Sequence, residues 1–211
     1  MDDKAARDAY VTGLFAQEDE ALAWIQAETR RHNMPQISLS AQEGRLLQWL
    51  AQTLQARRIV EIGTLAGYSG TWLARALPAD GRLYTLEVNS LHARVARAGF
   101  ARAGLDDRVH LLEGPALASL QKISAEAPFD LIFIDADKEG YPQYLAWALE
   151  HLRIGGVIAA HNAFRGGRVL APESEEDGGM DRFNRALAAE PRLSSTLIAV
   201  GDGMAVGVRL R

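Results

Sequence analysis

The fold is decided by one stretch of the sequence, Ile59-Val60-Glu61-Ile62-Gly63-Thr64-Leu65-Ala66-Gly67-Tyr68-Ser69-Gly70. Its first residues belong to a short apolar strand over 58–62, and its glycines form a turn that leads into a helical run over 71–77. Glycines let a backbone come close to a ligand, and the exposed amides of a helix N-terminus favour a negatively charged group. The stretch therefore predicts a strand, a turn and a helix that hold a nucleotide cofactor.

The spacing of the glycines narrows the kind of cofactor. The patterns G-x-G-x-x-G and G-x-x-x-x-G-K-[ST], which bind dinucleotides and phosphates, are both absent. The sequence instead has Glu61-x-Gly63-x-x-x-Gly67, with an acid inside the strand. A carboxylate there would repel a pyrophosphate, so a cofactor with a cationic part fits better.

Composition indicates one globular domain over 1–211, with 1–55 as an N-terminal helical cap within it. The 211 residues are 48% hydrophobic, which is enough for a substantial core. A net charge of -4 without a basic cluster argues against nucleic acid as a partner. The absence of cysteine excludes disulfides, thiolate metal sites and a cysteine nucleophile. Because no apolar run approaches the roughly 18 residues of a membrane span, we expect no membrane partner and a cytoplasmic protein.

The central part of the chain alternates between strand and helix. Strands are predicted at 58–62, 82–87, 109–112, 131–134 and 156–160, with helices near 68–77, 90–103, 115–124 and 139–152. The helices are long enough for right-handed crossovers, and short apolar strands are typical of a parallel sheet covered on both faces. The pattern predicts a doubly wound α/β domain.

Both ends of the chain add elements to this domain. Residues 5–32 predict one or two amphipathic helices with Leu14, Leu22 and Ile25 on the apolar face. Ser40 and Glu43 form a capping-box pattern ahead of a further helix whose apolar face is Leu46, Leu47 and Leu50.

After the fifth strand we expect a polar loop over 163–178, in which the acidic run 173–177 is solvated, and then a helix over 180–189. Two last strands, 193–200 and 204–210, flank Gly201-Asp202-Gly203 as an antiparallel hairpin. The complete expectation is a mostly parallel seven-stranded sheet with a C-terminal antiparallel hairpin and N-terminal helices.

Polar side chains follow three of the predicted strands. Glu87 ends the second strand, where an acid can accept hydrogen bonds from ribose hydroxyls. The fourth strand runs into Asp135-Ala136-Asp137-Lys138, and the fifth ends in His161-Asn162. Asp135, His161 and Asn162 offer a carboxylate, an imidazole and an amide oxygen, which predicts a metal site. The alternative is structural, with the Asp residues at a helix N-terminus and the histidine in the core.

Several motifs in order resemble the cation-dependent O-methyltransferases that use S-adenosylmethionine, the group of catechol and caffeoyl-CoA O-methyltransferases, with a Rossmann-like fold. The resemblance covers nearly the whole chain. The motifs that carry it are Ile37-Ser38-Leu39-Ser40, the stretch from Glu61 to Ser69, the stretch from Phe129 to Lys138, and Gly201-Asp202-Gly203-Met204.

The resemblance implies a role for each matching residue. The cofactor-binding positions that it implies are Leu39, Glu61, Gly63, Thr64, Ser69, Glu87, Ala116, Asp135 and Asp137. Among them Glu61, Gly63, Thr64 and Ser69 match positions around the methionine part, Glu87 the ribose acid and Ala116 the residue beside the adenine. Asp135 matches a metal ligand that also touches substrate, and Lys138 matches the proposed general base.

One position departs from the family pattern. The family normally ends its fifth strand in Asp-Asn, both metal ligands, whereas this chain has His161-Asn162. Imidazole suits Zn, Mn, Fe, Co or Ni but not Mg or Ca, which prefer oxygen. Three readings stay open: a retained site with altered metal preference, a weakened Mg site, or a metal-free site where His161 acts as the base.

The expected reaction is methyl transfer from S-adenosylmethionine to a hydroxyl of a small molecule with a vicinal diol, most simply a catechol. A divalent metal would lower the pKa of a phenol, which is near 10 in water. Lys138 would take the proton, and Asp135 would touch the acceptor. The loop over 163–177, with Phe164, Arg165 and Arg168, and the N-terminal helices would form walls of the acceptor pocket. We also expect a homodimer. The rival interpretations are a nicotinamide-dependent dehydrogenase and a cofactor-binding protein without catalysis.

Overall fold

A seven-stranded sheet forms the centre of the molecule in the computed structural model, which describes residues 3–211. The strands are β1 Arg58–Ile62, β2 Arg82–Glu87, β3 Val109–Glu113, β4 Phe129–Ile134, β5 Leu152–His161, β6 Leu193–Ile198 and β7 Met204–Arg209. Their order across the sheet is β3-β2-β1-β4-β5-β7-β6. The first five strands run parallel, and β7 pairs antiparallel with both β5 and β6. The predicted sheet with its terminal hairpin is confirmed.

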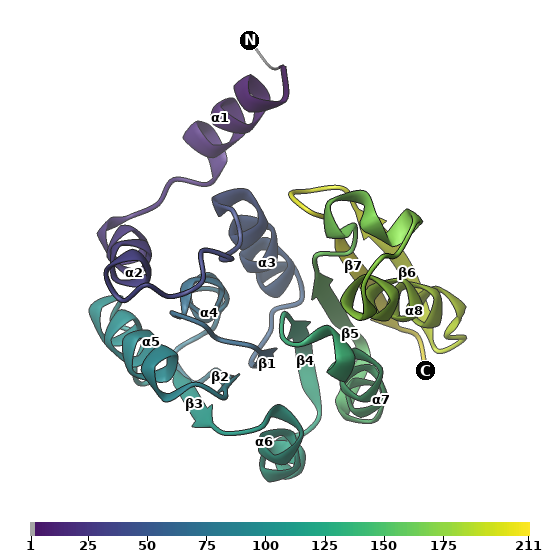
Figure 1. Cartoon of the computed structure of the whole chain (residues 1–211). Coiled ribbons are helices and arrows are strands. Elements are labelled where there is room, and N and C mark those ends of the chain that lie inside the picture. Colours follow the sequence, from purple (N-terminus) through teal and green to yellow (C-terminus); the bar gives the residue numbers. More distant parts are fainter. Residues whose placement is uncertain (1–2) are drawn as a thin grey trace.

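Eight α-helices accompany the sheet in the described part of the chain (Figure 1). They are α1 Asp3–Phe15, α2 Glu20–Arg31, α3 Ala41–Thr53, α4 Tyr68–Ala74, α5 Ser90–Arg102, α6 Ala116–Ile123, α7 Tyr141–His151 and α8 Glu175–Ala189. Short 3-10 turns lie at Ser124–Glu126, Lys138–Gly140 and Arg165–Leu170. None of the described helices is long and apolar enough to cross a membrane.

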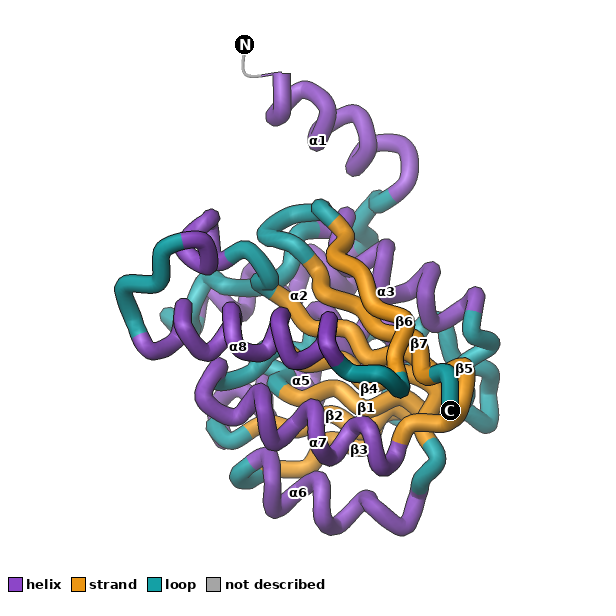
Figure 2. Tube along the Cα trace, turned by 90° about the vertical axis from the view of Figure 1, so that its right-hand side faces the viewer, coloured by secondary structure: helices purple, strands orange, loops and turns teal. Residues whose placement is uncertain are grey.

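The helices cover both faces of the sheet, as the short apolar strands require. Leu22 of α2, Leu47 of α3 and Leu73 of α4 belong to the apolar core on one face. Leu120 of α6 and Phe183 of α8 belong to the core on the other face, together with much of α7. Figure 2 shows α6, α7 and α8 packed on their side of the strands, while α1 projects from the body of the molecule.

The strand register places the site. Ile62 pairs with Ile134, and Ile134 pairs with Ala160, so β1, β4 and β5 end level with one another. The strand order reverses between β1 and β4, the place where an open α/β sheet leaves a crevice. The residues that follow these strand ends therefore meet at one edge of the sheet.

The capping box before α3 is confirmed. The Ser40 hydroxyl accepts the amide N–H of Glu43 at 3.3 Å, and the Glu43 carboxylate accepts the amide N–H of Ser40 at 2.8 Å. Leu47 is buried as predicted, and so are Leu22 and Ile25 of α2. Leu14 is exposed instead, because α1 stands away from the core.

The predicted polar loop over 163–178 is largely helical, and this prediction was wrong. A 3-10 segment covers Arg165–Leu170, and α8 begins at Glu175 rather than at 180. Ser174 caps α8, and three acids occupy its first turn, where the helix dipole favours negative charge. Asp177 is buried and accepts hydrogen bonds from Arg165 at 3.1 Å and Arg168 at 3.2 Å, so the acidic run is not simply a solvated loop.

Candidate active site

A cleft of about 1160 Å³ opens at the carboxyl edge of the sheet. Most of the predicted cofactor, catalytic and metal residues line it, namely Leu39, Gly63, Thr64, Ser69, Glu87, Ala116, Asp135, Asp137, Lys138, His161 and Asn162. Glu61 is the one predicted site residue that does not line it. Clefts of this size that combine apolar walls with a few convergent polar groups hold small molecules.

The glycine turn has the shape that the sequence predicts. Gly63 has φ +99°, and a Cβ at this position would collide with the carbonyl oxygen of Asp135. Gly67 has φ +85° and forms the N-cap of α4. Both positions lie in the left-handed region that favours glycine. The turn therefore brings the backbone after β1 against the backbone after β4.

Glu61 lies beneath the cleft. Its carboxyl group is fully buried and accepts hydrogen bonds from the hydroxyls of Ser69 at 2.6 Å and Thr85 at 2.5 Å. Burial raises the pKa of Glu61 to about 7, although the two hydroxyl bonds oppose the shift. Ser69 lines the cleft and Glu61 does not, so the Glu61 carboxyl group lies one hydrogen bond behind the wall of the cleft.

Glu87 is held rigidly at the end of β2. One carboxylate oxygen accepts the amide N–H of Leu65 at 2.8 Å, and the other accepts that of Asn89 at 2.8 Å. Each oxygen of a carboxylate has a second lone pair. Glu87 can therefore still accept hydrogen bonds from two neighbouring hydroxyl groups.

Asp137 and Ala116 occupy the starts of two helical segments. The Asp137 carboxylate accepts the amide N–H of Gly140 at 2.9 Å and the hydroxyl of Tyr144 at 2.7 Å. Ala116 is the first residue of α6. Leu39 reaches the cleft from the segment before α3, so the wall on that side is the stretch 35–40 rather than the helices α1 and α2.

Lys138 is almost completely buried, with an exposed fraction of 6%. Its ammonium nitrogen donates to the hydroxyl of Tyr141 at 2.5 Å and lies 3.5 Å from Asp135 Oδ1. Burial lowers the pKa of Lys138, and the negative charge of Asp135 opposes this. The Tyr141 hydroxyl in turn bonds to the carbonyl oxygen of Ile134 at 3.2 Å, which fixes the lysine at the strand end.

His161 lies between two carboxylates. Its Nδ1 is 3.2 Å from Asp135 Oδ2, and its Nε2 is 2.9 Å from Glu43 Oε1. Burial alone would lower the pKa of His161, but the hydrogen bonds to Asp135 and Glu43 outweigh it and raise the pKa to about 9. A ring that donates from both nitrogens has no free lone pair. This argues against His161 as a general base.

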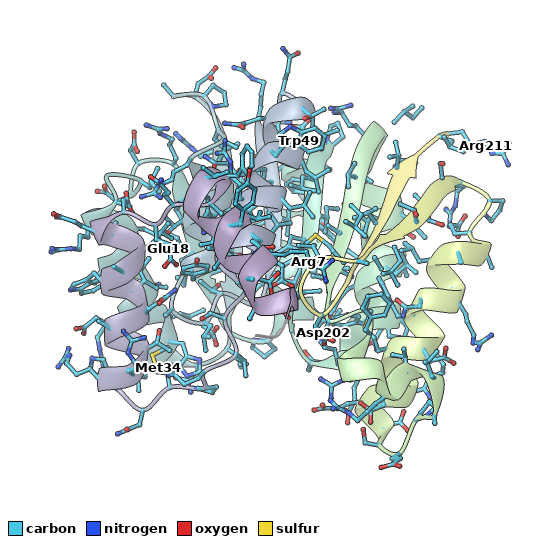
Figure 3. The ribbon with its side chains drawn as sticks, turned by 90° about the horizontal axis from the view of Figure 1, so that it is seen from above. Arg7, Glu18, Met34, Trp49, Asp202 and Arg211 are labelled. Atoms are coloured by element: carbon cyan, nitrogen blue, oxygen red, sulfur yellow. The ribbon has the colours of Figure 1, made fainter. Side chains whose placement is uncertain are left out.

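The same contacts test whether a divalent metal fits. A histidine ligand needs one free ring nitrogen, and in His161 both nitrogens face carboxylates. Asn162 donates its amide N–H to Asp202 at 3.3 Å, and Asp202 lies in the turn between β6 and β7 (yellow in Figure 3). Within residues 3–211, no three His, Cys, Asp or Glu side chains are arranged to hold a metal ion. As arranged, the predicted set of Asp135, His161 and Asn162 does not fit a metal.

Glu43 is the site residue that sequence reasoning missed. It was expected only as part of the capping box of α3, yet its carboxylate is 118 positions from its partner His161. Such a long-range pair leaves no local signal. Of the expected loop contacts, Arg165 lines the cleft with Glu176. Phe164 does not line it in the described structure, because its ring packs against Gly203.

Comparison with known proteins places this site in a family. Residues 13–210 match the family model described as O-methyltransferase. A catechol O-methyltransferase of Niastella koreensis is 44% identical over 210 residues, which cover 95% of each chain. A catechol O-methyltransferase of Mycobacterium tuberculosis is 43% identical over 95% of this chain and 94% of its own. The crystal structure of the O-methyltransferase TomG of Streptomyces achromogenes, involved in tomaymycin synthesis and in complex with SAM, covers 100% of both chains with a TM-score of 0.93 and 38% identity.

Proposed function

Because the chain belongs to the O-methyltransferase family, we propose that it transfers a methyl group from S-adenosylmethionine to a hydroxyl group of a catechol-like small molecule. The observation that carries the proposal is the cleft at the carboxyl edge of the sheet. It joins the predicted cofactor residues other than Glu61 to the buried Lys138 and the partly buried Asp135. Two relatives that are 44% and 43% identical are catechol O-methyltransferases, which supports the acceptor class.

The cofactor would lie along the ends of β1, β2 and β3. Glu87 would accept the ribose hydroxyls, and the first residue of α6, Ala116, would lie beside the adenine. The methionine part would lie in the glycine turn against Gly63, Thr64 and Ser69. The negative charge of Glu61 beneath Ser69 suits a cofactor that carries a sulfonium and an ammonium group.

Lys138 would act as the general base. Its lowered pKa increases the fraction of neutral amine, and its fixed position lets it receive a proton from an acceptor hydroxyl. The proton of the hydroxyl passes to the lysine nitrogen, while the methyl group passes from the sulfur to the hydroxyl oxygen. The products are the methyl ether and S-adenosylhomocysteine. Asp135 would hold the acceptor beside Lys138, and proximity would supply much of the acceleration.

The predicted divalent metal, whether Mg, Mn, Zn, Co or Ni, does not fit the described arrangement of Asp135, His161 and Asn162. The hydrogen bonds of His161 to Glu43 and Asp135 leave it no free nitrogen for a metal. The proton transfer and the methyl transfer need only side chains of the protein and the cofactor.

The function is tested by methylation of a simple catechol with labelled S-adenosylmethionine. Lys138→Ala should lower kcat by about 10²- to 10⁴-fold, the usual contribution of a general base, and leave binding of S-adenosylhomocysteine unchanged. The matched control is Lys122→Ala, which removes an exposed lysine of α6 and should leave both quantities unchanged.

Two outcomes would contradict these assignments. Equal losses of turnover and cofactor binding in Lys138→Ala would make the lysine structural. Tight binding of S-adenosylhomocysteine without methylation of any catechol would favour the rival interpretation of a cofactor-binding protein. The chain is not a nicotinamide-dependent dehydrogenase, because it lacks the G-x-G-x-x-G turn and belongs to another family.

We also propose that the chain forms a homodimer through α1. Tyr10, Leu14 and Phe15 of this helix are exposed apolar side chains, as is Trp49 of α3. Figure 2 shows α1 projecting from the rest of the molecule. A second copy of the chain would cover these side chains.

A further inference from the structure

The contact of His161 with two carboxylates connects three elements of the fold. His161 is the last residue of β5, Asp135 follows β4, and Glu43 lies in the first turn of α3. The exposed fractions are 4% for His161 and 3% for Glu43. Charged groups that are this deeply buried are stable only when they are paired and hydrogen-bonded. The partners of the two ring nitrogens therefore determine which nitrogen carries a hydrogen.

The Glu43 carboxylate receives hydrogen bonds on both of its oxygens. Oε2 accepts the amide N–H of Ser40 at 2.8 Å and the Ser40 hydroxyl at 2.6 Å. Oε1 lies 2.9 Å from His161 Nε2 and 3.4 Å from the amide nitrogen of Asp202. Because each of these neighbours can donate, Glu43 is an ionised acceptor. His161 Nε2 therefore carries a hydrogen.

On the opposite side of the ring, Nδ1 also faces a carboxylate oxygen. Nδ1 is 3.2 Å from Asp135 Oδ2, and Asp135 Oδ1 faces the ammonium group of Lys138 at 3.5 Å. A lone pair on Nδ1 would point at a lone pair of the carboxylate, which is repulsive. Something positive must lie between the two atoms. Because Lys138 faces the other oxygen of Asp135, this carboxyl group is ionised, and the candidates are a hydrogen on Nδ1 and a metal ion.

The ligands available favour the hydrogen. The carboxylates of Glu43 and Asp135 lie on opposite sides of the ring, so they cannot surround one ion together with it. A metal at Nδ1 would have Asp135 as its one carboxylate ligand, and that carboxylate already faces the positive charge of Lys138. A divalent metal in this place would be poorly neutralised.

We propose that His161 donates a hydrogen bond from each ring nitrogen, to Glu43 and to Asp135, and that this bridge replaces a divalent metal, so that methyl transfer by this chain needs no metal. The statement about the reaction rests on the proposed function. The statement about the hydrogen bonds of His161 does not. An aspartate with a divalent cation and a doubly donating histidine both bring one net positive charge to this point. The exchange therefore keeps Asp135 oriented toward Lys138 without a metal.

The first test measures metal binding directly, without turnover. The full chain with bound S-adenosylhomocysteine is titrated with Mn²⁺, and free Mn²⁺ is followed by electron paramagnetic resonance. We expect no stoichiometric binding by the native protein. We expect at least about tenfold tighter binding by His161→Asp, which places a third carboxylate beside Glu43 and Asp135. One Mn²⁺ per native chain that is lost in His161→Asn would overturn the proposal.

The second test reads the ring itself in the native protein, and a variant serves only to assign the signals. Long-range ¹H–¹⁵N spectra of the native protein distinguish a ring with two N–H groups from a ring with one. The His161 signals are assigned by their absence from His161→Asn, and Glu43→Gln serves as the isosteric control that weakens one hydrogen bond. Two N–H nitrogens support the bridge. One unprotonated nitrogen contradicts it.

The third test concerns the reaction. Methylation of a catechol is measured after dialysis against a chelator, and again with Mg²⁺, Mn²⁺, Co²⁺ or Zn²⁺ added. We expect the same rate in every sample. Loss of turnover with the chelator and recovery with one metal would overturn the proposal. No turnover in any sample, together with two N–H nitrogens on His161, would refute the proposed function and leave the bridge standing.

Discussion

Glu61 is a buried carboxyl group whose ionisation is costly in the folded protein. Burial raises the pKa of Glu61 from its ordinary value of 4.5 to about 7 in the folded protein. A carboxyl whose pKa is higher in the folded state than in the unfolded state binds its proton more tightly when folded. Its contribution to stability is therefore present below pH 4.5 and is lost as the pH rises through 7.

This predicts how Glu61→Gln changes the pH dependence of folding without cofactor. The difference in unfolding free energy between native protein and variant should fall by roughly 3 kcal/mol from pH 4.5 to above pH 7, at about 1.4 kcal/mol for each pKa unit. Urea denaturation at a series of pH values measures this difference. Saturating S-adenosylmethionine should flatten the slope, because its positive charges favour ionised Glu61. A difference that does not vary with pH would show that Glu61 keeps an ordinary pKa.

Single residues also show where prediction from the sequence ends. Asp135 and His161 could be placed together because parallel strands end at the same edge of a sheet, and the structure brings them within 3.2 Å. Their relation to Glu43 could not be predicted. It depends on how α3 packs over the end of β5, which involves many residues of the apolar core rather than any short motif. The predicted roles of the cofactor residues stay predictions until binding is measured.

The N-terminus of α3 links helix capping to the cleft. Ser40 caps the helix, lines the cleft and donates its hydroxyl to Glu43. Ser40→Ala should lower the unfolding free energy by about 1 kcal/mol, the typical loss for an N-cap, and should also weaken cofactor binding. Denaturation and calorimetric titration with S-adenosylhomocysteine measure the two effects.

A matched variant separates the two effects of Ser40. Ser174 caps α8 by accepting the amide N–H of Asp177 at 3.2 Å, but it does not line the cleft. Ser174→Ala should cost a similar amount of stability and leave cofactor affinity unchanged. If both variants bound the cofactor as the native protein does, the cap of α3 would have no part in the site.

The helices and strands could be predicted wherever apolar residues recur at a regular spacing. The parallel strands and the capping box follow from local patterns, and their bounds agree within a few residues. β5 is longer than predicted, Leu152–His161, because its first residue pairs with Phe129 of β4 ahead of a register shift, and His161 at its end pairs with Met204 of β7. The start of α8 was missed since its first turn is acidic and contains no apolar residue.

At the scale of the whole molecule, the exposed apolar side chains of α1 predict a dimer. Phe15 and Leu14 are 65% and 56% exposed, and an apolar face of this kind favours association. Multi-angle light scattering should give the mass of a dimer for the native chain, and Leu14→Asp with Phe15→Asp should give a monomer. Leu210→Asp, at an exposed apolar residue near the other end of the chain, should remain dimeric. A monomeric native chain would contradict the proposed dimer.

The hydrogen bond between Glu43 and His161 also ties the N-terminus of α3 to the end of β5. Ser40 and Glu43 line one wall of the cleft, and the ring of His161 contacts Asp135 on the other side. The shape of the cofactor wall and the orientation of Asp135 therefore depend on the same carboxylate. A substitution of Glu43 should for this reason change cofactor affinity and turnover together.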